Sequence, residues 1–166
     1  RRAPNPPPYV QFPYEVEQPR KSVERQVAAG LLQGNEGLLT LGESLVSALT
    51  HVLGSRPMQL RILSILPTDD PVAMLPVARD AVAALDTGEG VAVFCDIYGA
   101  TPCNVAIKLA VPGRVEVISG VNLPMLVRAF TYRTRSMDTL LTKAVSGGCE
   151  GVLHVPATNR HAATRS

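Results

Sequence analysis

Residues 91–104, VAVFCDIYGATPCN, decide the fold of this chain. They begin as an apolar run rich in β-branched residues, which is typical of a buried strand, and the run ends abruptly at the carboxylate of Asp96. A turn containing Gly99 follows, and Thr101 and Pro102 then predict a helix with Thr101 as its N-cap and proline at its first position. This order brings a carboxylate and the free N–H groups of a helix N-terminus to one edge of a sheet. Such an edge attracts anions, and phosphate above all.

On both sides of this stretch, helical spacing of apolar residues alternates with short apolar runs that are typical of strands. The spacing predicts helices over residues 40–54, 69–85, 101–110, 122–132 and 136–148, the last of which ends at Gly147 and Gly148. It predicts strands over residues 58–66, 90–95, 115–118 and 151–155, and one short strand within 27–39. The alternation predicts an α/β fold, a three-layer sandwich with a mostly parallel central sheet and helices on both faces.

Two loops fall at the edge of this sheet where ligands bind, outside the carboxyl ends of the parallel strands. One loop is residues 96–101, and the other is residues 119–122. Asn122 ends the second loop and is expected to cap the helix that follows, while residues 69–71 and Ser136 are expected to open two other helices.

A chain of 166 residues with 46% hydrophobic content is long enough for one domain with a substantial core. We expect that domain at residues 27–155, between an irregular Pro-rich segment, 1–26, and a polar tail, 156–166. No apolar run approaches the roughly 18 residues that a membrane span needs, and the N-terminal residues carry no apolar signal segment. Direct insertion into a membrane is therefore not expected.

Charge and cysteine content exclude several function classes. A net charge of +2 with scattered basic residues argues against nucleic acid, and an aromatic content of 4% argues against a stacking platform. The three cysteines, Cys95, Cys103 and Cys149, lack metal-binding spacing. Their odd number, without a secretory context, favours reduced thiols in a cytoplasmic setting. Neither a metal nor a cofactor is predicted.

Residues 96–104, DIYGATPCN, and residues 120–126, GVNLPML, together closely resemble the IIA domains of the mannose/fructose class of the bacterial phosphoenolpyruvate-dependent sugar phosphotransferase system. The family pattern is an Asp, an aromatic-Gly-Gly/Ala-Ser/Thr-Pro turn, an Asn shortly after it, and a Gly-Val-Asn-Leu/Ile-Pro-Met-Leu loop. The segment LGESL at 41–45 and the ending GGCEGV at 147–152 also fit. The resemblance covers about residues 40–155.

The resemblance implies a phosphoryl carrier. A family histidine accepts phosphate from a small phosphocarrier protein and passes it to a sugar-specific IIB domain, with no metal or cofactor. Asp96 matches the carboxylate that orients this imidazole, and the backbone of residues 99–101 (Gly99, Ala100 and Thr101) matches the phosphate-receiving turn. Tyr98, Asn104 and Asn122 match the rim of the site, where Tyr98 shields the site or contacts the partner. The resemblance also implies a cytoplasmic homodimer.

The chain departs from the family at the phosphoacceptor. Counting back from the segment LGESL puts the histidine at position 38, which is Leu38, and leucine cannot carry phosphate. We expect His51 at the far end of the first helix, His154 in the last strand and His161 in the tail, none of them in a phosphoryl role. Either the carrier function is lost, or residues 1–39 are not the native start of the domain.

Four other interpretations remain open from the residues themselves. Asp96 could cap a local turn, and Cys103 could serve packing alone. The fold could act as a regulatory or binding module that carries no phosphate. A nucleotide-binding α/β protein is the weakest alternative, because the chain holds neither GxxxxGK[ST] nor GxGxxG.

Overall fold

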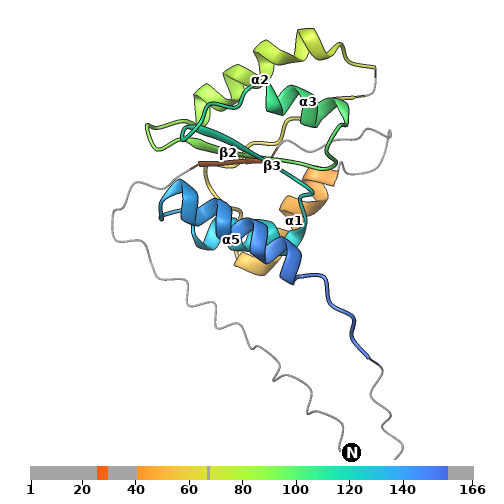
Figure 1. Ribbon diagram of the computed structural model, residues 1–166, viewed down its shortest axis with the longest axis vertical. Helices are drawn as coiled ribbons and strands as arrows, with labels where there is room; N and C mark the ends of the chain where they lie inside the picture. The colour runs from red at the N-terminus through yellow and green to blue at the C-terminus, as the bar shows by residue number, and fades with distance from the viewer. Residues whose placement is uncertain (1–25, 30–40, 67, 157–166) are drawn as a thin grey trace, which may run out of the picture.

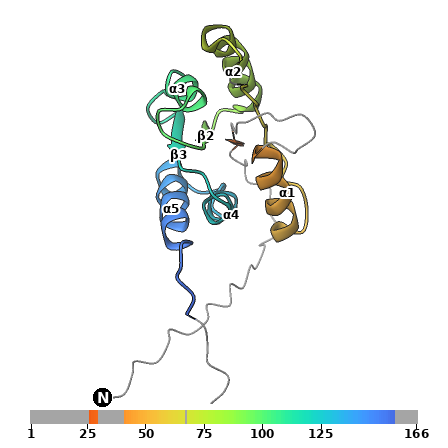
Figure 2. The same cartoon turned by 90° about the vertical axis from the view of Figure 1, so that its right-hand side faces the viewer.

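The computed structural model describes residues 26–29, 41–66 and 68–156. The described residues form a three-stranded parallel sheet in the order β1 (Gln26–Ala29), β2 (Val91–Cys95) and β3 (Val115–Ser119). They also form five helices: α1 (Leu41–Leu53), α2 (Pro71–Leu85), α3 (Thr101–Ile107), α4 (Leu123–Thr131) and α5 (Met137–Glu150). In two perpendicular views, α2 and α3 cover one face of the sheet, while α1, α4 and α5 lie beyond the other (Figures 1 and 2). The expected α/β sandwich is confirmed.

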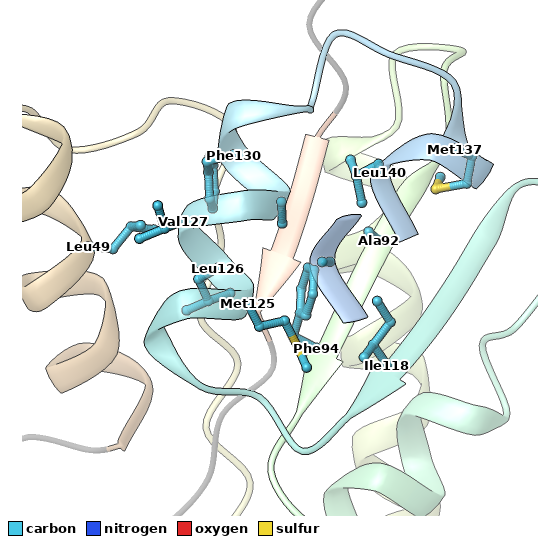
Figure 3. Packing of buried hydrophobic residues seen from close by; sticks show 12 residues of the cluster. Leu49, Ala92, Phe94, Ile118, Met125, Leu126, Val127, Phe130, Met137 and Leu140 are labelled. Atoms are coloured by element: carbon cyan, nitrogen blue, oxygen red, sulfur yellow. The ribbon is translucent and has the colours of Figure 1, made fainter. Parts of the chain in front are cut away.

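The core lies on both faces of β2, and the side chains of this strand alternate between them. Ala92 and Phe94 belong to the larger cluster, which also includes residues of α1, α4 and α5 (Figure 3). Val91 and Val93 belong to a smaller cluster on the other face. Because both faces of β2 are covered, its sequence is continuously apolar rather than alternating.

Most of the predicted helix starts are confirmed by their hydrogen bonds. The side chain of Asp70 accepts from the Val72 amide at 2.9 Å, and that of Asn122 from the Met125 amide at 3.0 Å. Ser136 accepts from the Thr139 amide at 3.3 Å. These three side chains satisfy amides that have no partner inside their helices.

The expected cap at Thr101 is wrong. Thr101 is the first residue of α3, and Ala100 precedes it as the N-cap without any side-chain hydrogen bond. The helix starts one residue early because Gly99, at φ +89°, turns the chain before Thr101 is reached.

The expected strand over residues 58–66 does not form, apart from a single-residue bridge at Ile62. Gln59 has a φ of +60°, which interrupts the extended backbone near the start of the segment. Leu63 and Ile65 nevertheless pack into a small cluster with Ala78 of α2 and other residues. The apolar pattern therefore reports burial here rather than strand pairing.

Helix α5 does not end at its glycine pair but runs through it to Glu150. A Cβ atom on Gly147 would lie 2.3 Å from Cγ of Arg128, and one on Gly148 would lie 2.7 Å from Cε of Met125. The two glycines therefore allow α5 to pack closely against α4, with Gly147 under the tighter restriction, and they do not act as a stop signal.

The expected last strand, residues 151–155, is also absent. These residues follow α5 without regular structure, and Val152, Leu153 and Val155 are exposed. Figures 1 and 2 show this segment leading away from the helices and the sheet. A strand needs a neighbour to hydrogen-bond with, and this segment meets none among the described strands.

None of the helices in the described ranges combines the length and the apolar character that crossing a bilayer demands.

A charged turn fixes the amino end of β2. One carboxylate oxygen of Asp86 accepts from the amides of Gly88 at 2.9 Å and Gly90 at 3.1 Å, and the other pairs with Nε of Arg114 at 2.9 Å. Arg114 also donates from Nη1 to the Gly88 carbonyl at 2.9 Å. The hydrogen bond from Gly88, aided by that from Gly90 and by the Arg114 charge, lowers the pKa of Asp86 below its usual value.

This turn predicts acid sensitivity. The folded pKa of Asp86 lies below the usual 3.8, so the ionised carboxylate stabilises the fold above that value and its contribution disappears as the pH falls through the folded pKa. We expect Asp86→Asn to lower the free energy of unfolding by about 1 to 3 kcal/mol at pH 7. The difference should shrink steadily below about pH 4 in urea titrations at several pH values. A difference that stays constant down to pH 2 would contradict this account.

Candidate functional site

The two loops expected at the carboxyl edge of the sheet are joined there by backbone hydrogen bonds. The Gly120 amide donates to the Asp96 carbonyl at 2.7 Å, and the Val121 amide donates to the Cys95 carbonyl at 3.1 Å. These bonds extend the pairing of β2 and β3 beyond the strands themselves. Asp96 and the loop that ends in Asn122 therefore lie side by side.

Only one oxygen of the Asp96 carboxylate accepts a hydrogen bond from a described residue. One oxygen accepts from the amide of the next residue, Ile97, at 2.7 Å. Its second oxygen makes no hydrogen bond to a described residue. That oxygen remains available for an imidazole N–H or another donor at this edge.

The turn after Asp96 is held from two sides. The Ala100 amide donates to the Ile97 carbonyl at 3.2 Å, and Nδ2 of Asn104 donates from α3 to the Gly99 carbonyl at 3.0 Å. The Ala100 amide is thus already used, whereas the amides of Gly99 and Thr101 donate to no described backbone acceptor. Of the three amides expected to meet phosphate, only these two are free to turn towards a ligand.

The second loop is anchored to α5. Besides capping α4 with its oxygen, Asn122 donates from Nδ2 to the Gly148 carbonyl at 3.2 Å. A Cβ atom on Gly148 would lie 3.2 Å from that same nitrogen, so a larger residue would require Asn122 to shift slightly. The sequence reasoning missed Gly148 as a supporting residue, although a Gly-Gly pair inside an amphipathic helix is a signal for close packing.

The outer rim of the turn is apolar and exposed. Ile97 is 68% exposed and Tyr98 is 77% exposed. Two large apolar side chains on an exposed turn are more typical of a contact surface than of a solvated loop. Tyr98 was expected at the rim, whereas Ile97 was not singled out, although an isoleucine in a Gly-containing turn is a usable signal.

The structure describes two of the three histidines, and both are exposed. Leu38 and His161 lie outside the described residues, and β1 ends at Ala29, well before position 38. His51 stands exposed in the last turn of α1. His154 is exposed on the segment after α5 rather than in a strand. That segment starts at the site edge, because a Cβ on Gly151 would lie 2.4 Å from Cγ of Pro124, in the first turn of α4.

Across the described ranges, no three His, Cys, Asp or Glu side chains converge as metal ligands would. The carboxyl edge of the sheet therefore presents one available oxygen of Asp96, the available amides of Gly99 and Thr101, and the Thr101 hydroxyl. Such a set can orient an imidazole and bind phosphate oxygens by hydrogen bonds.

Comparison with known proteins identifies a matching protein family. A family model described as "PTS system fructose IIA component" matches residues 39–145. The mannose-specific EIIAB component of the phosphotransferase system of Escherichia coli K12 is 36% identical over 93 residues, which cover 54% of this chain and 29% of that protein. The chain thus spans about three tenths of the length of these curated relatives.

Solved structures show the same fold. The mannose/sorbose-specific IIA subunit of Enterococcus faecalis superposes with a TM-score of 0.68 at 18% identity, covering 82% of this chain and 98% of that one. The IIA protein associated with the fucose utilization operon of Streptococcus pneumoniae gives a TM-score of 0.66 at 20% identity, with coverages of 80% and 94%.

Proposed function

We propose, from the premise that this chain belongs to the family of phosphotransferase-system fructose IIA components, that it serves as a phosphoryl-carrying IIA component. It would accept phosphate from the small phosphocarrier protein in the cytoplasm and pass it to a sugar-specific IIB domain. We place this domain at residues 27–155. The observation that carries the proposal is the backbone junction at which Gly120 and Val121 bind the carbonyls of Asp96 and Cys95.

The chemistry follows from the groups at that junction. The available oxygen of Asp96 would accept the N–H of a histidine ring and leave the opposite ring nitrogen unprotonated for attack on phosphorus. The P–N bond to the histidine of the phosphocarrier would break as the new P–N bond forms. The amides of Gly99 and Thr101 and the Thr101 hydroxyl would hold the phosphoryl oxygens meanwhile.

A second candidate is favoured by Leu38, which stands where the family pattern has its histidine. A chain without an acceptor could still bind the phosphocarrier through the exposed Ile97 and Tyr98 and act as a regulatory module. In this candidate function, the site binds the phosphocarrier but transfers no phosphoryl group.

Incubation with phosphoenolpyruvate, the first enzyme of the system and the phosphocarrier separates the two candidates. Acid-labile phosphate on the chain supports the carrier, and fragment masses show whether His51, His154 or His161 holds it. Asp96→Asn should then slow labelling on the order of a hundredfold or more. Asp80→Asn changes an exposed carboxylate of α2 in the same way and should leave the rate unchanged.

The same mixture also tests the regulatory module. No label, together with calorimetric binding of the phosphocarrier that Tyr98→Ala weakens, supports this second candidate. Val72→Ala removes a similarly exposed side chain from α2 and is the matched control. If the chain takes up no label and also does not bind the phosphocarrier, both candidates are refuted.

We also propose that the chain is a homodimer. Val152, Leu153 and Val155 form an exposed apolar segment with the pattern of a strand, and β3 is an edge strand of the described sheet. A second copy can provide the neighbour that this segment lacks. Sedimentation equilibrium at several concentrations measures the assembly, and a chain that stays monomeric throughout would exclude it.

A further inference from the structure

Asn104 ties the site turn to α3 with two hydrogen bonds. Its side-chain Nδ2 donates to the Gly99 carbonyl at 3.0 Å, and its backbone amide donates to the Ala100 carbonyl at 3.0 Å. The bond from the backbone is the one that any residue at this position of the helix makes. The bond to Gly99 depends on the side chain, because it needs a donor at the end of a short chain. The identity of residue 104 therefore matters for the turn.

Gly99 has little else to fix its backbone. Its φ is +89°, and a Cβ atom built on it would meet no other atom within 4 Å, so no packing surrounds it on that side. Glycine rotates about its backbone bonds more freely than any other residue. Its ψ angle sets the direction of its own carbonyl. A hydrogen bond to that carbonyl therefore fixes the softest angle of the turn.

The peptide plane held in this way lies between two amides of the site. It contains the Gly99 carbonyl and the Ala100 amide, which point in opposite directions because the peptide bond is trans and planar. The Ala100 amide donates to the Ile97 carbonyl at 3.2 Å, so the plane is held at both ends. The amides of Gly99 and Thr101, which donate to no described backbone acceptor, stand on either side of it. Their direction relative to each other follows from this plane.

We infer that Asn104 is a positioning residue, which aims the amides of Gly99 and Thr101 at one and the same phosphoryl group. This inference rests on the function proposed above, because the phosphate-receiving role of the two amides belongs to that function. Asn104 touches backbone and acts through the turn. Its bond also keeps the partly negative carbonyl oxygen of Gly99 directed at α3, where it does not repel an incoming dianion.

Loss of this bond is expected to cost preorganisation. Without a donor at position 104, Gly99 samples several ψ angles, and the two amides face a phosphoryl group together only part of the time. The apparent dissociation constant rises in inverse proportion to the fraction of chains in the binding conformation. We expect a rise of roughly three- to tenfold, which is what the loss of one neutral hydrogen bond produces.

Asn104→Leu in the full chain tests the inference. Leucine has nearly the same shape without a donor, and it favours helix more than asparagine does, so α3 is not weakened. Inorganic phosphate is titrated into the isotope-labelled chain while the amide signals of Gly99 and Thr101 are followed by NMR. Both signals should shift with one dissociation constant in the parent chain, and this constant should rise in Asn104→Leu. The urea midpoint of unfolding should stay the same.

Ile107→Ala is the matched control, because it shortens an exposed side chain about one turn further along α3. It should leave the phosphate constant unchanged. Amide exchange with deuterium measures the tether without any phosphate. The Ala100 amide should exchange severalfold faster in Asn104→Leu, since the plane that presents it is no longer held at its other end, and it should not do so in Ile107→Ala.

Equal phosphate constants for the parent chain and Asn104→Leu would overturn the inference. A lower urea midpoint with an unchanged constant would overturn it too, because Asn104 would then be a structural residue only. If phosphate shifts neither Gly99 nor Thr101 in the parent chain, the failure lies in the proposed function. The exchange rate of Ala100 then decides whether Asn104 holds the turn, and an unchanged rate in Asn104→Leu shows that it does not.

Discussion

A chain carrying Leu38→His is expected to take up acid-labile phosphate at least about a hundredfold faster than the parent chain, at position 38. The reason is chemical, because a leucine side chain has no lone pair with which to form a bond to phosphorus, whereas imidazole has one. The rest of the proposed machinery is already in place, since Asp96 has an available oxygen and lies beside the loop of Gly120. Rapid-quench labelling followed by fragment mass analysis measures the rate and the position.

The matched control for this variant is Leu39→His, which makes the same chemical change one residue along the chain. It should gain much less label than Leu38→His, because the family pattern places the acceptor at one position only. Combining Leu38→His with Asp96→Asn should remove most of the gain. Equal labelling of both histidine variants would show that the count from the segment LGESL misplaces the acceptor, and a Leu38→His chain that binds the phosphocarrier without labelling would exclude the proposed role of Asp96.

Phe94→Ala is expected to cost about 3 to 5 kcal/mol of the free energy of unfolding. Phe94 is fully buried in β2, one residue before Cys95, and it belongs to the cluster that includes Ile118 of β3 and Met125 of α4 (Figure 3). Removing the ring leaves a cavity where the sheet meets the helices, and close-packed neighbours collapse into it only in part. Since a domain is typically stable by about 5 to 15 kcal/mol, one substitution can remove much of the margin.

Urea denaturation followed by circular dichroism measures this loss. Phe94→Leu retains most of the buried apolar volume and should lose clearly less than Phe94→Ala. Ile97→Ala, three residues along and 68% exposed, should change the unfolding free energy by no more than about 0.5 kcal/mol. Similar losses for Phe94→Ala and Ile97→Ala would show that the cluster around Phe94 is not the core of this domain.

Local signals of the sequence predicted the fold and the edge of the site. The caps at Asp70, Asn122 and Ser136 depend on a side chain and an amide two or three residues away, so a single sequence contains all of the relevant information. The same holds for β2, whose continuous apolar run requires cover on both faces. The placement of Asp96 beside the second loop followed from one rule, that parallel strands end at the same edge.

The cap at Thr101 fails for a local reason, the turn at Gly99, whereas the other failures involve neighbours distant in sequence. Nothing near Gly147 in sequence shows that Arg128 passes 2.3 Å from the place of its missing Cβ, so the pair was read as a helix stop. Residues 151–155 have the residue types of a strand but no neighbouring strand, and residues 58–66 bury Ile65 without joining a ladder. The hydrogen bond from Asn122 to Gly148 joins residues 26 positions apart, and the Gly-Gly pair indicates close packing there without identifying the partner.

The glycine-lined contact between α4 and α5 couples the order of the second loop to the end of α5. Each glycine in a helix interior costs about 1 kcal/mol relative to alanine, so α5 on its own would be a weak helix. It is held by α4, and in return its Gly148 carbonyl receives the Asn122 side chain that starts α4. Melting of α5 would therefore release that loop as well, and a partially unfolded chain would have neither.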